Sequence, residues 1–138
     1  MDVSAEIDRI LDEAREVTSR AKRQRELAAA WPSETLAGAL EQLRPFLAAK
    51  LGKVQVLADG LALGEAALRF AIRPGPPLGT VGVVPSLEVV ASVDAEVGGL
   101  ATDRLAISPL EDATRAWVQL QVLVFLRRIA PHLVERPQ

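Results

Sequence analysis

The sequence of 138 residues has no cysteine and no tyrosine, one histidine and one methionine. Without cysteine there is no disulfide, no thiolate nucleophile and no thiolate ligand for zinc. With one histidine there is no metal site built on several imidazoles. Because the chain has only two Trp and three Phe, its core must consist mainly of Leu, Val, Ile and Ala. These absences favour a protein that is not an enzyme and that binds no cofactor, although Asp, Glu, Arg and Ser can catalyse without His or Cys.

The net charge is small, and long apolar runs are absent. The net charge of −2 is too small to indicate a polyanionic or polycationic partner. No stretch approaches the roughly 18 apolar residues of a membrane-spanning helix. The first residues lack the basic and apolar segments of a secretory signal. We therefore expect a cytoplasmic protein without a membrane partner, folded as a single domain over residues 1–138.

Residues 2–30 are predicted to form one long helix, because they include no Gly or Pro. Acidic residues are concentrated in its first half and basic residues in its second, which complements the helix dipole. Its apolar residues form a narrow stripe, close to a heptad repeat between Ile7 and Ala21: Ile7, Ile10, Leu11, Ala14, Val17, Ala21, Leu27 and Ala28. A narrow stripe buries little of a helix. Residues 1–31 are therefore expected to project, or to pair with a second copy through Ile7 and Leu11.

A second helix is predicted after Trp31-Pro32, since Pro32 disfavours helical geometry at the residue before it. Ser33 is the expected cap of this helix. Leucines at helical spacing continue to Leu51, Pro45 is expected to kink or split the helix, and Gly52 to end it.

The period then changes to that of a sheet. Alternating apolar residues predict about four mainly antiparallel strands, within residues 53–58, 65–73, 80–94 and 100–107. Asp59-Gly60 is typical of a hairpin turn. Leu61 and Leu63 are at odd positions, whereas the apolar face of the following strand is at even positions. This change indicates a bulge at Gly64 or a longer loop. In the last strand Leu105 and Ile107 are expected to face inward.

A long C-terminal helix is predicted over residues 109–133. Ser108, Pro109 and Glu111 have the spacing of a capping box with proline at the first position. One apolar stripe includes Leu110, Ala113, Trp117, Leu120, Leu123 and Val124; the other includes Val118, Val122, Phe125 and Ile129. A helix that is apolar on two sides must be covered on two sides. We expect the sheet to cover one side, and other helices or a second subunit to cover the other. The residues expected at a subunit interface are Val118, Val122, Phe125 and Ile129.

The predicted fold is therefore α+β, with two N-terminal helices, about four mainly antiparallel strands in one sheet, and one long C-terminal helix packed on that sheet. Several residues could form catalytic, phosphate or metal sites but are better explained as structural or solvated residues: His132; Gly75, Gly79 and Gly82; Asp94, Glu96 and Asp103; Glu111 and Asp112.

Three functions remain open. The first is a non-enzymatic protein–protein interaction module, adaptor- or chaperone-like, that is homodimeric and binds a further protein. The second is binding of a small apolar ligand in a cleft lined by Leu68, Phe70, Trp117 and Leu120. The third is weak nucleic-acid binding by the basic segment Arg20, Lys22, Arg23 and Arg25. These four cations spread around the helix, so a solvated helix end is the preferred interpretation.

Overall fold

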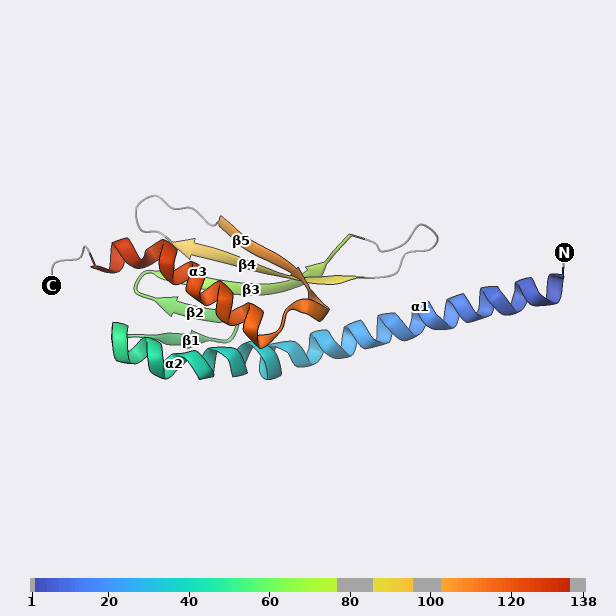
Figure 1. The fold of residues 1–138 in the computed structure, drawn as a ribbon, viewed down its shortest axis with the longest axis horizontal. Coiled ribbons are helices and arrows are strands. Elements are labelled where there is room, and N and C mark those ends of the chain that lie inside the picture. Colours follow the sequence, from blue (N-terminus) through green and yellow to red (C-terminus); the bar gives the residue numbers. More distant parts are fainter. Residues whose placement is uncertain (1, 77–85, 96–102, 135–138) are drawn as a thin grey trace.

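The computed structural model describes residues 2–76, 86–95 and 103–134. Helices at the N-terminus, a five-stranded antiparallel sheet and a C-terminal helix confirm the α+β class (Figure 1). The elements in chain order are α1 (Val3–Trp31), η1 (Pro32–Leu36), α2 (Ala37–Leu51), β1 (Gln55–Leu57), β2 (Gly60–Leu63), β3 (Ala66–Pro74), β4 (Leu87–Ala95), β5 (Asp103–Pro109), η3 (Leu110–Asp112) and α3 (Arg115–Val134).

The helices α1, η1 and α2 form one continuous helical segment, so the predicted break at Pro32 is wrong. Trp31 keeps helical angles (φ −56°, ψ −47°), and η1 is a single π-helical turn in which the N–H of Ala37 donates to the carbonyl of Pro32. Widening the helix by one residue is a known way to accommodate a proline. The Ser33 hydroxyl donates to the Ala30 carbonyl instead of capping a new helix.

The second helix also continues through its internal proline, Pro45, and is not split. It ends as predicted at Gly52, whose φ of +82° is the left-handed conformation that glycine adopts most readily.

The sheet has the order β1-β2-β3-β4-β5, and every neighbouring pair is antiparallel. The fifth strand arises because Leu61 and Leu63 form a strand of their own, paired with Leu68 and Ala66. Gly64, with φ +62°, lies in the tight turn between β2 and β3, so neither the bulge nor the long loop is present. Gly60 pairs with Leu57 and is thus the first residue of β2 rather than part of the turn.

The alternation predicted for β4 is confirmed, but that predicted for β5 is partly wrong. A register shift between Ala91 and Ser92 changes the pairing with β5. Ile107 lies opposite Val90 and is exposed, whereas Ser108 lies opposite the buried Val89 and is buried itself. The segment predicted as strand over residues 80–84 lies outside the described residues.

The last helix starts later than predicted. Ser108 and Pro109 belong to β5, and η3 intervenes before α3. The residue that caps α3 is Thr114, whose hydroxyl oxygen accepts from the Trp117 N–H at 3.2 Å. The predicted capping box is therefore wrong, because pairing with Val89 holds Ser108 in the sheet.

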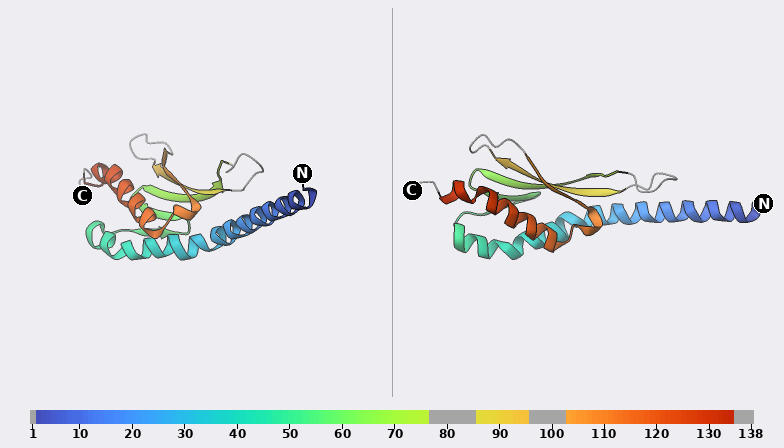
Figure 2. Two further views of the ribbon diagram at one scale, coloured as in Figure 1. Left: turned by 45° about the vertical axis from the view of Figure 1, so that its right-hand side comes forward. Right: turned by 45° about the horizontal axis from the view of Figure 1, so that its top comes forward.

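Helices α2 and α3 lie on the same side of the sheet, and the segment α1 runs out beyond it (Figure 2). The sheet and the helices α1, α2 and α3 contribute to one core, which includes Trp31, Leu36, Leu40, Leu61, Leu68, Phe70, Val89, Val93, Val118, Val122, Phe125 and Ile129. On the opposite face of the sheet Arg69 pairs with Asp59 at 2.9 Å and Arg73 with Glu88 at 2.6 Å. Within the described residues, no helix combines the length and apolarity needed to cross a membrane.

Candidate docking surface on the first helix

The C-terminal end of α1 is fixed to the rest of the fold. Trp31 is buried, and its indole Nε1 donates to the Ala113 carbonyl at 2.8 Å. One turn earlier Ala28 packs against the core, and Gln24 Nε2 donates to Glu111 Oε1 at 2.6 Å. The N-terminal part of α1 extends away from the sheet and the other helices (Figure 1).

A single line of residues follows α1 in alternating steps of four and three: Val3, Ile7, Ile10, Ala14, Val17, Ala21, Gln24, Ala28 and Trp31. Alternating steps of four and three give the 3.5-residue period of a coiled-coil seam. Its last three members face their own chain. We call the free part, Val3 to Ala21, the α1 seam.

The α1 seam is apolar and open to solvent towards its N-terminal end. The exposed fractions are 63% for Val3, 51% for Ile7 and 59% for Ile10, and the neighbouring Leu11 is 46% exposed. Single exposed apolar residues are common, but four large ones within three turns of one helix form a contiguous patch. The predicted exposure of Ile7 and Leu11 is consistent with these values; Val3 extends the pattern beyond the predicted stripe.

The exposed part of α1 is stabilised locally, without help from the core. Asp2 caps it by accepting from the N–H groups of Ser4 and Ala5 at 3.1 and 3.3 Å. Three ion pairs one turn apart add to this: Glu6–Arg9, Asp12–Arg15 and Glu16–Arg20. Such exposed pairs contribute about 0.3–0.5 kcal/mol each. A helix that is already formed loses less conformational entropy when a partner binds.

Charge is distributed unevenly along the exposed helix. Residues 2–16 include six acidic and two basic side chains, whereas residues 17–25 include four basic and no acidic ones. The basic group is the predicted nucleic-acid segment Arg20, Lys22, Arg23 and Arg25. All four are exposed, and Arg20 is engaged by Glu16 at 2.7 Å.

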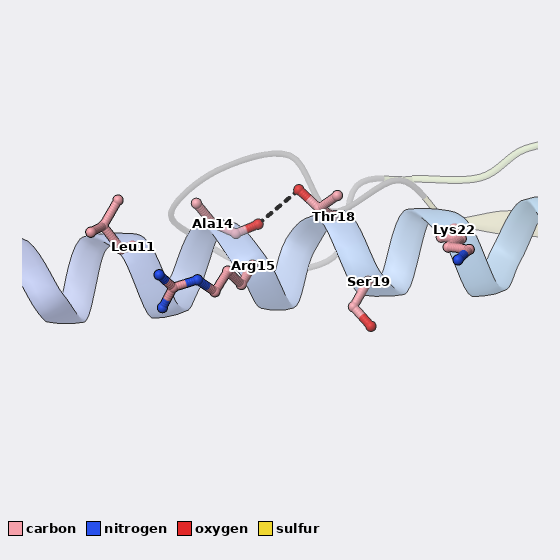
Figure 3. A pocket seen from close by; sticks show the side chains of 6 residues that line it. All are labelled: Leu11, Ala14, Arg15, Thr18, Ser19 and Lys22. Carbon is pink, nitrogen blue, oxygen red and sulfur yellow. Dashed lines mark hydrogen bonds between the residues drawn. The ribbon is translucent and has the colours of Figure 1, made fainter.

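A shallow depression beside α1 is lined by Leu11, Ala14, Arg15, Thr18, Ser19 and Lys22 (Figure 3). Leu11, Ala14 and Thr18 point to one side of the helix and Ser19 to the other, and the Thr18 hydroxyl donates to the Ala14 carbonyl at 2.9 Å. Since all six residues belong to one helix, they do not surround a small molecule. The depression is therefore a shallow feature of the helix surface and not a ligand pocket.

The stripe of α3 that was predicted to meet a second subunit is instead inside the chain. Val118, Val122 and Phe125 have no exposed surface and Ile129 has 3%. These four residues pack into the core beneath the sheet, so they are not available to a second chain. The exposed apolar residues of α3 belong to the other stripe, where Leu120 and Leu123 are 54% and 52% exposed. The helix is thus rotated by about half a turn from the predicted orientation.

The residues of the predicted ligand cleft do not surround a common space. The Phe70 ring packs against two indoles, with its centroid 6.1 Å from that of Trp31 and 6.0 Å from that of Trp117. Leu68 is fully buried, whereas Leu120 is exposed on the outer side of α3. Aromatic packing therefore occupies the position at which the cleft was expected.

The remaining polar candidates are dispersed. Asp103 is paired with Arg128, Glu111 accepts from Gln24, and His132 lies in the last turn of α3. Glu96, Gly79 and Gly82 lie outside the described residues. Across residues 2–76, 86–95 and 103–134, no three His, Asp or Glu side chains gather in a group suited to a metal ion.

Comparison of the chain with protein-family models, with curated proteins and with solved structures finds no match. The functional argument therefore depends on the geometry of α1.

Proposed function

We propose that this protein is a non-enzymatic protein–protein interaction module whose docking element is the α1 seam. The observation that carries the proposal is the exposure of Val3, Ile7 and Ile10 at heptad spacing, on a helix whose base is anchored in the core. The core takes its residues from Ala28 onward. The apolar side chains of the seam contribute nothing to it, so their burial against another helix is the interaction that would stabilise them.

The mode of binding is helix against helix. A seam with a 3.5-residue period packs its side chains into the holes of a second helix, and charged residues beside the seam select the partner and its orientation. The anchored base at Trp31 makes α1 a rigid arm of the body rather than a loose tail. An adaptor or chaperone-like role would use the arm in this way.

The two other functions have less support. Binding of a small apolar ligand needs a cavity where Phe70 and Trp117 are in contact. Nucleic-acid binding needs several cations on one face, whereas Arg23 and Arg25 lie about 100° and 60° from Lys22, in opposite directions around the helix.

Site-specific photocrosslinking tests the proposal. A benzophenone amino acid replaces Ile10 on the seam or, as the matched control, Ser19, which lies on the opposite side of the same helix. Both positions are exposed, so neither replacement should unfold the chain. In cells that produce the protein, irradiation should give a protein adduct at position 10 and none at position 19. Equal adducts at both positions, or none at position 10, would refute the proposal.

A further inference from the structure

We infer that the partner of the α1 seam is the same helix of a second copy of this chain, bound in antiparallel orientation with Val3 opposite the partner's Ala21. This inference rests on the proposed function and names the partner for it. Three independent features of α1 lead to it: the order of large and small residues, the order of charges, and the length of the free helix.

The first feature is side-chain size along the seam. In an antiparallel pair, each a position lies opposite a d position of the other helix. With Val3 opposite the partner's Ala21, Ile7 lies opposite the partner's Val17 and Ile10 opposite the partner's Ala14. Every residue of the α1 seam then meets an apolar residue of the other seam, and two of these three pairs join a large side chain to a small one. Leu11 meets the partner's Leu11 on one flank, which covers a further exposed apolar residue.

The second feature is charge. In this alignment residues 2–7 of one chain lie against residues 17–22 of the other. The first segment contains Asp2 and Glu6 and no base, and the second contains Arg20 and Lys22 and no acid. Glu6 faces the partner's Arg20 across the flank opposite Leu11. A parallel pair would instead place acidic halves together and Arg20 next to the partner's Arg25, which is unfavourable.

The third feature is length. The seam from Val3 to Ala21 spans about 28 Å at a rise of 1.5 Å per residue. Beyond it, Gln24 is bound to Glu111 of its own chain. A pair that overlaps from Val3 to Ala21 therefore uses the free helix and stops where each body begins. The two bodies then lie at opposite ends of the pair.

Neighbouring alignments fit less well. A shift by one heptad towards greater overlap places Ile7 opposite the partner's Gln24, a polar side chain already engaged with Glu111. A shift in the other direction leaves Val17 and Ala21 without a partner residue. The chosen alignment has one unfavourable contact, because Glu13 lies near the partner's Glu13 at its centre.

Cysteine exchange tests orientation and register together. The chain has no cysteine of its own, so Ile7→Cys and Val17→Cys variants each have one thiol. The two purified variants are mixed under reducing conditions and then oxidised, with Ser19→Cys as the control on the opposite face. An antiparallel pair gives the mixed disulfide between positions 7 and 17. It gives no disulfide between two copies of position 7, which lie about 15 Å apart. Disulfides that join two copies of the same variant in place of the mixed disulfide, or no disulfide at all, would overturn the inference.

A charge variant gives a second readout. Glu13→Gln removes the like-charge contact and should lower the dimer dissociation constant about two- to fivefold, measured by sedimentation equilibrium. In a parallel pair Glu13 faces the partner's Thr18, and an unchanged dissociation constant would therefore contradict the antiparallel arrangement. A protein that stays monomeric at high micromolar concentration, yet gives a seam-specific adduct with another protein at position 10, would refute the self-pairing and leave the interaction module intact.

Discussion

The indole Nε1 of Trp31 donates a hydrogen bond of 2.8 Å to the backbone carbonyl of Ala113, 82 residues further along the chain. The bond joins the base of α1 to the segment just before α3, and both groups are buried. The same indole packs against Phe70 of the sheet, so one side chain connects all three parts of the fold.

Replacing Trp31 with Phe should lower the free energy of unfolding by about 1–3 kcal/mol. A phenyl ring is smaller than the indole, so the substitution leaves a gap in the core, and the Ala113 carbonyl loses its donor in a buried position. Urea denaturation measures the change. Leu123→Ala, on the exposed side of α3, is the matched control and should shift the value by less than about 0.5 kcal/mol. Equal effects of the two substitutions would mean that the hydrogen bond contributes nothing.

The orientation of α3 can be tested with one residue from each stripe. Phe125→Ala should destabilise the chain by about 3–5 kcal/mol, because it leaves a cavity beneath the sheet. Leu120→Ala should change the stability little, since that side chain is about half exposed. Thermal or urea unfolding of the two variants gives the answer. A larger loss for Leu120→Ala would indicate that α3 presents its other stripe to the sheet.

Gly60 lies where another backbone approaches closely. A Cβ at this position would be 1.8 Å from the Leu68 carbonyl oxygen in the adjacent strand. Gly60→Ala should therefore cost at least about 3 kcal/mol, since backbone must move. Gly52→Ala meets no neighbouring atom but keeps a φ of +82°, and should cost only about 1–2 kcal/mol. A lower urea midpoint for Gly52→Ala than for Gly60→Ala would contradict the close approach of the two backbones at Gly60.

Arg115 stabilises the π-helical turn between α1 and α2. Its Nη2 and Nε donate to the Glu34 carbonyl at 2.8 and 3.2 Å, and its guanidinium lies against Gly38. Arg115→Met should cost about 1–2 kcal/mol, because a carbonyl in the turn loses a charged donor. Arg127→Met, at an exposed position of the same helix, is the control. Chemical denaturation that ranks the two variants equally would show that Arg115 does not support the turn.

The exposed seam allows binding and folding to be separated. Ile7→Gln together with Ile10→Gln should abolish association, because two large seam residues lose their apolar surface. The helix should remain, since Gln is a good helix former and both positions are exposed. Sedimentation measures the first property and circular dichroism the second. Association that survives both substitutions would show that the seam is not the docking element.

Sequence patterns alone led to the α+β class, the antiparallel sheet, the alternation in β3 and β4, and a long first helix with a narrow apolar stripe. These features depend on periodicity, which is a local property of the chain. The same pattern identified Ile7 and Leu11 as candidate contacts. Extending its steps of four and three to Val3 and Trp31 would have revealed the whole seam and the residue at which it enters the core.

Other features were decided only by the tertiary structure. The helix passes through Pro32 because a π turn accommodates the ring, and Arg115, 81 residues away, donates to the carbonyl of Glu34 in that turn. Ser108 joins the sheet rather than capping α3 because it pairs with Val89. The stripe of α3 that faces the sheet cannot be chosen from its own residues, since both stripes are apolar. Contacts between distant segments decide such choices, and no local preference of the chain encodes them.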